Sequence, residues 1–389
     1  MTPTEYWLWL AFGLGFGAVN SGELLLAFPG GAEEILGQLG GDKMDEILTQ
    51  KQAEKLASSR PEDFALRMNH YASLGIETLG FDDTRYPDAL RRINNPPPAL
   101  FVKGDTSLLN GQLAIGMVGA RRPSAYGVEA TKALGRGVAM GGAIIVSGLA
   151  AGLDAEAHKA ALAVNGPTVA CIAFGHDQCY PAANRKLMEV IERNGAVVSE
   201  YRPGSVARAG HFPARNRIVA GLSLATLVVE AAMRSGALIT ARLAADAGRD
   251  VFAVPGSIHN PMARGCHRLI RSGAGLVESA DEVVQALAPL MQQFAGGQGG
   301  AGGGFGDLAD LAGGGGELDP ALQQLLDMRG DGAGGGLPAG GRGGFQPGGA
   351  AGGGRGGFQP GGAAGGGRGG FQPGGAAGGG RGGTGQPGG

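Results

Sequence analysis

Short apolar runs alternate with longer amphipathic segments between residues 113 and 290. Each run lacks polar alternation and either ends in a glutamate or is followed by a small residue, a proline or a glutamate. This is typical of parallel strands that are buried on both faces, with helices between them. The pattern predicts a doubly wound, mostly parallel α/β sheet with helices on both faces. Its expected strands are Ile115–Val118, Ala143–Val146, Thr168–Phe174, Val197–Glu200, Leu224–Val229 and Val251–Val254.

Helix-length apolar pieces separated by Gly, Asp or Pro fill residues 1–75. Tyr6–Val19 is 14 residues long, below the roughly 17–25 that a membrane-spanning helix needs. No Lys or Arg precedes it, so a signal peptide is not expected. We predict a small helical packing domain at 1–75 and a sheet domain at 76–290. The other helical pieces are Leu24–Phe28, Ala32–Leu39, Met44–Leu56 and Pro61–Leu74.

Two turns between a strand and a helix carry the first candidate chemistry. The turn Gly119–Pro123 places Arg121 and Arg122 where one strand ends, and the next strand ends in the small-residue turn Ser147–Gly152. Asp154 is placed to cap the helix that follows. Because parallel strands end at the same sheet edge, the two turns predict an anion-binding crevice for a phosphate backbone or a nucleotide.

Two later helix starts add to this expectation. Arg185 and Lys186 lie in the opening turns of a predicted helix, where the helix dipole disfavours positive charge. They are therefore expected to face a ligand or a carboxylate, and a solvated helix face is the alternative. The backbone amides of Ser235 and Gly236, which open another helix, are a further candidate phosphate cradle.

The segment His211–Gly221, with the sequence HFPARNRIVAG, is the strongest single motif. Phe212 offers a stacking face for a base, and Arg215 and Arg217 offer guanidinium groups for phosphates. Asn216 suits a hydrogen bond to a base edge or a role in holding the loop. The alternative is structural: Phe212 would be a core residue and the arginines would form salt bridges.

Together these motifs resemble the DprA/Smf family over about Tyr6–Leu287. Further matches are Gly152-Leu153-Asp154 with His158, the Tyr-Pro-x-x-Asn segment at 180–184 and the segment that begins at Gly265. The resemblance implies an extended Rossmann-like domain after a helical module of the SAM or helix-hairpin-helix kind. It also implies a cytoplasmic homodimer, without cofactor or metal, that binds single-stranded DNA. Such a protein protects incoming DNA and loads the RecA recombinase during natural transformation.

The resemblance and the residue chemistry together define the expected sites. In relatives, the segment corresponding to Leu269–Leu276 helps to build the homodimer. The expected DNA-binding residues are Gly119, Arg121, Arg122, Ser147, Gly148, Arg185, Lys186, Phe212, Arg215, Asn216, Arg217, Ser235 and Gly236. The expected dimer-interface residues are His267, Leu269, Ile270 and Leu276.

Net charge and cysteine content limit the kinds of partner and cofactor that are expected. The formal net charge is −2, which argues against coating of duplex DNA by bulk charge but permits a local basic groove. The three cysteines show no metal-binding spacing and no disulfide framework, in keeping with a reducing cytoplasm. No metal, cofactor or membrane partner is expected.

Glycine dominates the C-terminal part of the chain, where most of the excess among its 79 glycines lies. We predict a linker at 291–316 and a remnant of a winged-helix domain at 317–330. A disordered tail is predicted at 331–389. In this tail a 13-residue Arg-Gly-Gly-Phe-Gln-Pro unit starts at Arg342, Arg355 and Arg368, with a truncated copy at Arg381. Its composition is that of weak single-strand binders, and a plain flexible tail is the alternative.

An enzymatic function is the alternative to DNA binding. Glu200 and Glu230 end strands, where sheet enzymes often keep acids, and the fold resembles Rossmann-type phosphoribohydrolases that process nucleoside phosphates. No Pro-Gly-Gly-x-Gly-Thr loop stands in the right context here. Asp154 and His158 lie four residues apart, but no third ligand or nucleophile relates to them. We therefore expect a binding protein rather than an enzyme.

Overall fold

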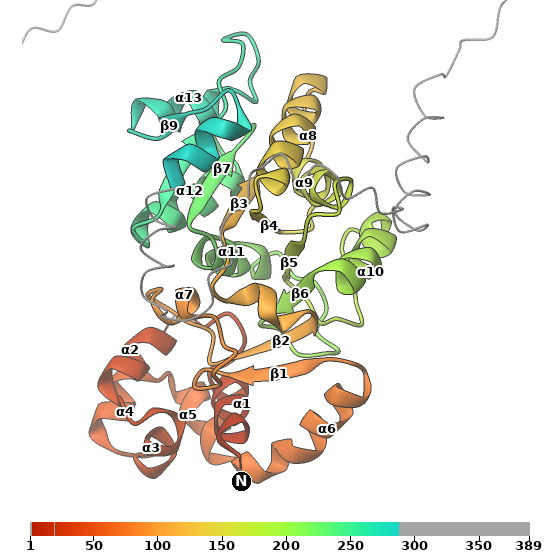
Figure 1. Cartoon of the computed structure of the whole chain (residues 1–389). Coiled ribbons are helices and arrows are strands. Elements are labelled where there is room, and N and C mark those ends of the chain that lie inside the picture. The colour runs from red at the N-terminus through yellow and green to blue at the C-terminus, as the bar shows by residue number, and fades with distance from the viewer. Residues whose placement is uncertain (1, 19, 288–389) are drawn as a thin grey trace, which may run out of the picture. The chain divides into compact units, whose positions relative to one another are not determined.

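A nine-stranded sheet forms the centre of the computed structural model, which describes residues 2–18 and 20–287 (Figure 1). The strand order is β1-β2-β6-β5-β4-β3-β7-β8-β9. The pairs β1–β2 and β2–β6 are antiparallel, and every other pair is parallel. The predicted doubly wound, mostly parallel sheet is confirmed. The strands are β1 Glu77–Gly80, β2 Ala99–Gly104, β3 Ala114–Val118, β4 Ile144–Ser147, β5 Thr168–Ile172, β6 Ala196–Ser199, β7 Ala225–Val228, β8 Asp250–Ala253 and β9 Gly275–Leu276.

Helices cover both faces of this sheet because successive side chains of a strand point to opposite faces. Ile115 and Met117 of β3 pack toward α8 and α9, whereas Val118 packs toward α11 and α12. Both faces are therefore apolar, which explains the unbroken hydrophobic runs in the sequence. One face carries α8 Ala125–Met140, α9 Leu153–Leu162 and α10 Arg185–Asn194, and the other carries α7 Asp88–Arg91, α11 His211–Leu222, α12 Gly236–Asp246 and α13 Arg264–Arg271 (Figure 1).

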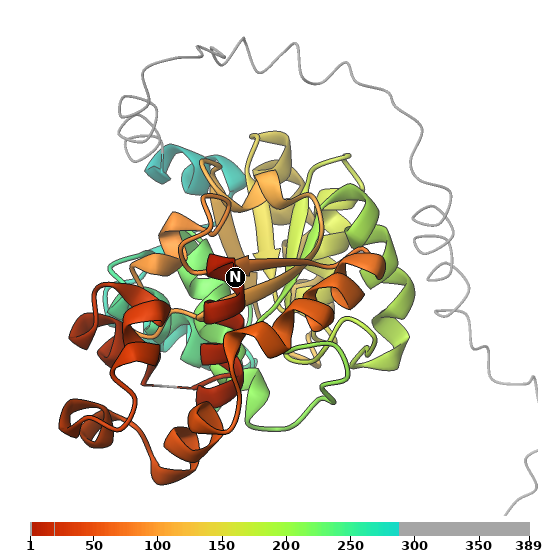
Figure 2. The same cartoon turned by 90° about the horizontal axis from the view of Figure 1, so that it is seen from below.

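The N-terminal helices pack at the β1–β2 end of the sheet (Figure 2). Their core includes Trp9, whose indole Nε1 donates to the carbonyls of Leu56 and Ser59, and it is closed by Ala99 and Phe101 of β2. The antiparallel strand β2 therefore serves as the base on which the helical module rests. The module consists of α1 Pro3–Leu14, α2 Ser21–Ala27, α3 Gly31–Gly37, α4 Asp42–Ile47, α5 Gln50–Ala57, the 3₁₀ turn Pro61–Phe64 and α6 Ala65–Ser73.

One helix prediction in this module is wrong. The expected single helix Met44–Leu56 is two helices, because Leu48 is extended and Thr49 starts a new helix. The Thr49 hydroxyl accepts a hydrogen bond from the Gln52 amide, and the Gln52 side chain accepts one from the Thr49 amide. This reciprocal pair is a capping box, which stabilises a helix start.

The predicted linker at 291–316, the winged-helix remnant and the glycine-rich tail lie outside the described residues, so they stay predictions. Within the described part of the chain, no helix is long and apolar enough to cross a membrane. Tyr6–Val19, the most apolar N-terminal segment, forms α1 up to Leu14 and buries its tryptophans in the helical module.

Candidate nucleic-acid interface

A crevice of about 690 Å³ lies at the carboxyl ends of β3, β4 and β7. β3 stands between β4 and β7, and the chain winds outward from it in both directions, so the crevice is at the topological switch point. Open α/β sheets bind their ligands at this place. Nine of the predicted DNA-binding residues line it: Gly119, Arg121, Arg122, Gly148, Phe212, Arg215, Asn216, Ser235 and Gly236.

The HFPARNR motif lies on a helix, α11, and not on a loop. Pro213 is tolerated because it stands in the first turn, where its missing N–H has no helical partner. Residues three or four apart share a face of a helix, so one face of α11 lines the crevice. This face carries Phe212, Arg215, Asn216 and Val219. The apolar residues later in the motif were the sequence signal for this helix.

Aromatic and guanidinium groups meet at the mouth of the crevice. The Arg121 guanidinium carbon lies 5.3 Å from the ring centroid of Phe212, a cation–π distance. The rings of Tyr180 and Phe212 have centroids 5.5 Å apart, and Tyr180 is 52% exposed. The sequence reasoning did not place Tyr180 or the exposed Arg234 in the site, although both line the crevice.

Arg217 requires a correction, because it faces away from the crevice. Its guanidinium forms a two-point ion pair with Glu200, with N···O distances of 2.7 and 2.6 Å, and its Nε donates to the Asn95 carbonyl. Burial alone would lower the pKa of Arg217, but the Glu200 carboxylate raises it on balance. Residues two apart on a helix do not share a face. The expectation that Arg217 offers a guanidinium to phosphate is therefore wrong, and the salt-bridge alternative describes it.

Arg215 was expected to offer its guanidinium to phosphates, but it is buried. Its side chain is buried in the floor of the crevice, and Nη1 donates to the Cys171 carbonyl at 2.7 Å. Burial lowers the pKa of Arg215, and the nearby Asp154 carboxylate opposes that shift. Its Nε has no hydrogen-bond partner among the described residues. Arg215 therefore supports the floor from within.

Asp154 is not the predicted helix cap, since Gly152 occupies that position. Its carboxylate is buried near the backbone amides of Gly119, Gly148 and Ala150 and near the Arg215 guanidinium. Burial raises the pKa of Asp154, and Arg215 and these amides oppose the shift. The Asp154 carboxylate thus lies beneath the turns that follow β3 and β4.

Ser147 is a second member of the predicted set that lies inside. It is fully buried, and its Oγ donates to the Met117 carbonyl of β3 at 2.6 Å. The hydroxyl thus joins the ends of two adjacent strands and does not reach the crevice. Its expected contact with DNA is corrected to a structural role.

The two residues of the expected phosphate cradle, Ser235 and Gly236, lie at the start of α12. The Ser235 Oγ accepts a hydrogen bond from the Ala237 amide as the helix cap, and Gly236 is exposed in the crevice. The Asn216 side chain donates to the Gly236 carbonyl at 3.3 Å. Of the two roles expected for Asn216, the structure therefore shows the one that holds the loop.

Arg185 and Lys186 are exposed at the start of α10, outside the residues that line the crevice. The Arg185 guanidinium donates to the Asp177 carbonyl at 3.2 Å. The Asn184 side chain donates to the carbonyls of Leu149 and Ala150, so the start of α10 is attached to the β4 turn. The two cations therefore stand beside the crevice on an element joined to its rim.

The acids behind the enzymatic alternative have structural partners. Glu230 accepts hydrogen bonds from the backbone and hydroxyl of Ser124 and from the Asn260 side chain, which holds the start of α8. His158 is buried beside the Thr168 hydroxyl at 2.7 Å, and burial lowers its pKa to about 3. No cluster of three metal-ligating side chains occurs within residues 2–18 and 20–287.

The predicted dimer residues differ in exposure. Leu269 and Ile270 of α13 are partly buried against the core, and the His267 ring lies 3.0 Å from the Gly256 carbonyl. Leu276 is 49% exposed on β9, the last strand of the sheet. Of the four, Leu276 is the best exposed candidate for a contact between copies.

Fold and site define a class: a Rossmann-like α/β protein with a cationic, aromatic crevice at its switch point. Within that class, the sequence profile of the family described as DNA recombination-mediator protein A matches residues 77–288. The chain belongs to this family, as its resemblance to DprA/Smf proteins predicted.

Relatives and solved structures agree with the assignment. The chain is 41% identical over 217 residues to the DNA processing protein DprA of Bacillus subtilis, covering 56% of this chain and 73% of that protein. It is 45% identical to the protein Smf of Synechocystis over 54% of each chain, so it spans about half the length of that relative.

Two solved structures are similar to this chain. The X-ray structure of DprA from Streptococcus pneumoniae superposes with a TM-score of 0.63 at 36% identity, covering 73% of this chain and 98% of that one. A structure of DprA from Helicobacter pylori is described for its single-stranded DNA binding mode. It has a TM-score of 0.50 at 32% identity, and the match covers 55% of this chain and 96% of that one.

Proposed function

We propose that this protein binds single-stranded DNA in the switch-point crevice and loads the RecA recombinase onto it during natural transformation. The observation that carries the proposal is the cluster of Arg121, Phe212 and Tyr180 at the crevice mouth. Guanidinium groups next to aromatic faces suit a strand whose backbone is charged and whose bases are unstacked. The Helicobacter pylori relative, described for its single-stranded DNA binding mode, supports the same ligand.

The charge around the crevice supports a polyanion. Its lining contains four arginines and one acid, Asp154, which is buried beneath the turns. Arg121, Arg122 and Arg234 are exposed and have no ion pair among the described residues. Arg185 and Lys186 extend the basic surface along α10. A phosphate backbone would therefore meet cations without a competing exposed carboxylate in the lining.

We expect single strands to bind more tightly than a duplex of the same length. The base edges and faces of a duplex are stacked and unavailable to Phe212 and Tyr180, whereas those of a single strand are exposed. Affinity should fall with salt, with a log–log slope of about −0.7 per phosphate contact. Fluorescence anisotropy with matched oligonucleotides at several salt concentrations measures both. Equal affinity for the two forms at every salt concentration would contradict the proposed site.

Replacing Arg121 by alanine should weaken single-strand binding by about 1–3 kcal/mol, roughly 5- to 150-fold, without changing the melting temperature. The side chain is exposed and its loss leaves no buried group unpaired. Lys186→Ala should weaken binding in the same direction. Arg136→Ala, an exposed arginine on α8 outside the crevice lining, is the matched control and should bind normally. Normal binding by Arg121→Ala would remove the crevice from the DNA site.

We further propose a homodimer built on the α13–β9 surface, which would join two crevices and raise avidity for a strand that spans both. Leu276→Arg should give a folded monomer with weaker DNA binding and poor RecA loading. In the monomer the new charge would face water, because Leu276 is exposed, whereas in the dimer the partner would bury it. Sedimentation, circular dichroism and a strand-exchange assay measure the three effects. A monomeric wild type that still loads RecA would contradict this part of the proposal.

A further inference from the structure

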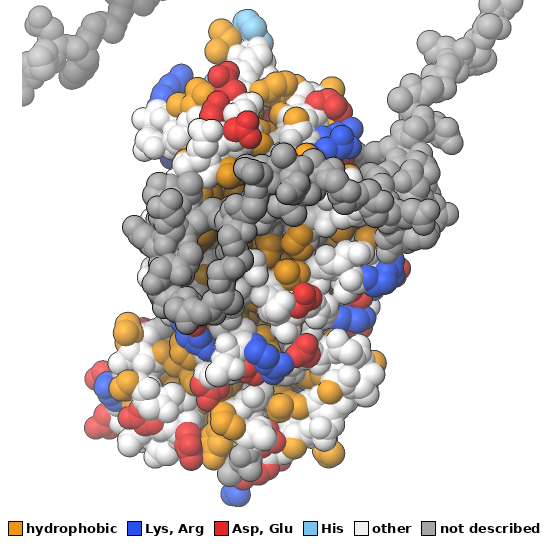
Figure 3. Space-filling view, viewed as in Figure 1, with side chains coloured by type: hydrophobic (Ala, Val, Ile, Leu, Met, Phe, Trp, Pro, Cys, Tyr) orange, Lys and Arg blue, Asp and Glu red, His pale blue; other side chains and the backbone are white. Residues whose placement is uncertain are grey.

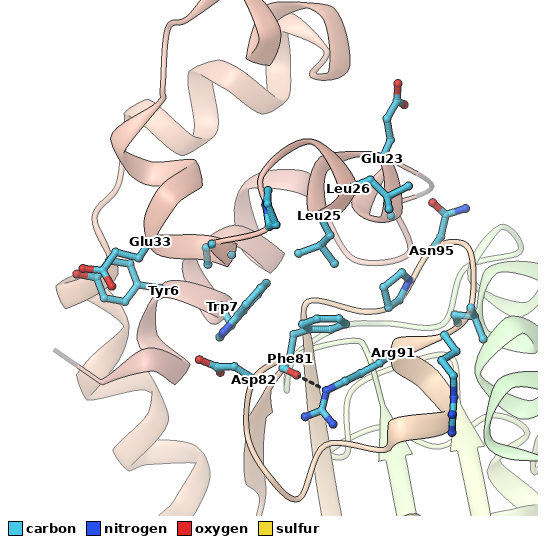
Figure 4. Close-up of a pocket in the computed structure, with 18 of the residues that line it drawn as sticks. Tyr6, Trp7, Glu23, Leu25, Leu26, Glu33, Phe81, Asp82, Arg91 and Asn95 are labelled. Atoms are coloured by element: carbon cyan, nitrogen blue, oxygen red, sulfur yellow. Dashed lines mark hydrogen bonds between the residues drawn. The ribbon is translucent and has the colours of Figure 1, made fainter.

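A larger hollow, of about 1170 Å³, lies between helices α1–α3 and the segment that follows β1 (Figure 4). Its floor is aromatic: the rings of Trp7 and Phe81 have centroids 5.2 Å apart. Leu25 and Leu26 face it from α2, and Leu26 is 87% exposed. We call this hollow the aromatic groove. Leu26, and in part Leu25 and Phe81, keep apolar surface open to solvent here, whereas Trp7 in the floor is only 4% exposed.

The rim of the aromatic groove is acidic. Glu23, Glu33 and Asp82 are exposed along it, and the Tyr6 side chain lies beside Glu33 at one end (Figure 4). The pKa of Tyr6 is raised by desolvation and then by the negative charge of the Glu33 carboxylate. The groove thus presents carboxylates next to aromatic faces, a combination that suits a guanidinium group.

Two arginines, Arg91 and Arg92, also line the groove, but its exposed charge remains mainly negative. The Arg91 guanidinium is engaged by the Phe81 and Asp83 carbonyls and by Asp88. Arg92 is exposed, against three exposed rim acids. Residues 1–75 as a whole contain ten Asp and Glu against five Lys and Arg. Acidic side chains are spread over the lower part of the molecule, where these helices lie (Figure 3). This surface repels DNA and attracts a basic segment.

The chain itself carries a basic segment of the matching kind. Residues 332–389 contain four arginines and no Asp or Glu, and three of those arginines begin an Arg-Gly-Gly-Phe unit. Each unit offers one guanidinium and one aromatic ring separated by two glycines. The 55 residues from 287 to 342 span up to roughly 180 Å when extended. The first unit can therefore reach any surface of a domain of this size.

We propose that the aromatic groove is a docking site for an Arg-Gly-Gly-Phe unit of this chain's own tail. The phenylalanine ring would pack against Leu25, Leu26 and the accessible part of Phe81, and the arginine would lie against Tyr6 and the Glu33 carboxylate. The two glycines between them leave the backbone free to place the ring in the apolar part of the groove and the guanidinium at its acidic end. Three equivalent copies raise the local concentration of the unit near the groove.

Site-specific photo-crosslinking in the full chain tests this docking. A benzophenone amino acid at position 358, which is Phe358 in the second unit, should crosslink to residues of α1 and α2. The matched control is the same amino acid at Thr384, because Arg381-Gly-Gly-Thr384 repeats the unit without its phenylalanine. We expect the control to give a several-fold lower yield on α1 and α2. Equal yields from both positions, or crosslinks spread over the whole surface, would overturn the proposal.

Charge reversal on the groove gives the second measurement. Glu33→Arg should lower the crosslinking yield from position 358 about fivefold or more, since it replaces the partner of the guanidinium by a like charge. Glu46→Arg, an exposed acid on α4 outside the groove, is the control and should leave the yield unchanged. Mixing isotope-labelled and unlabelled chains shows whether the tail in the groove belongs to the same chain or to a second copy. Crosslinks between different chains, in place of crosslinks within one chain, would show a second copy in the groove and would overturn docking of the chain's own tail.

Discussion

Arg217→Ala is expected to lower the free energy of unfolding by about 3–5 kcal/mol, the usual cost of leaving one member of a buried ion pair without its partner. The Glu200 side chain is only 2% exposed and both of its oxygens accept from Arg217. The same guanidinium donates to the Asn95 carbonyl, so it also fixes the segment before β2 against α11. Urea denaturation followed by circular dichroism measures the loss.

The control for this prediction also removes the negative charge of Glu200, which Arg217→Ala would leave buried without a partner. In the double variant Arg217→Met/Glu200→Gln the buried carboxylate is neutral, so a large part of the lost stability should return. DNA binding by this variant, measured well below its melting temperature, should be close to that of wild type. An Arg217→Ala protein as stable as wild type but unable to bind DNA would contradict the structural role and return Arg217 to the DNA site.

Much of the sheet was predictable because its strands are buried on both faces. Runs such as Ile115–Val118 and Val169–Ile172 have no charged or polar side chain, and they are too short for a typical helix. The antiparallel strands β1 and β2 carry Gly, Lys or Glu, and the pairing of β1 with β2 and of β2 with β6 has no comparable signal in the sequence. The crevice followed from the strand ends, since parallel strands finish at one edge.

The roles of individual side chains were less predictable, for a geometric reason. Arg215 and Arg217 are equally basic in the sequence, and only their positions on a helix send one under the crevice and the other to Glu200. Asp154 has the position of a helix cap by sequence, but the turn from Gly152 points its carboxylate at the amides of two loops. Such contacts depend on how elements far apart in the chain are placed against each other.

The crevice floor itself can be tested at Gly148. A Cβ built at this residue would lie 1.8 Å from Nη1 of Arg215 and 2.5 Å from its Cζ, so the two cannot coexist as placed. Arg215 has little room to move, because it is 3% exposed and its Nη1 is bonded to the Cys171 carbonyl. Gly148→Ala should therefore lower the free energy of unfolding by about 1–3 kcal/mol, the usual cost of overpacking. Single-strand affinity should fall as well, since Arg215 and the β4 turn are displaced into the crevice.

A double-mutant cycle shows whether the clash with Arg215 is the cause. In an Arg215→Met background the unbranched thioether can bend away from the new methyl group, so Gly148→Ala should cost much less there than in wild type. The difference between the two costs is the coupling energy, expected at about 0.5–3 kcal/mol for side chains in contact. Gly37→Ala, where no atom lies within 4 Å of the new Cβ, is the control and should not destabilise the protein. Equal costs of Gly148→Ala in both backgrounds would mean that the glycine is needed for the β4 turn itself, and the account of Arg215 as support for the crevice floor would fail.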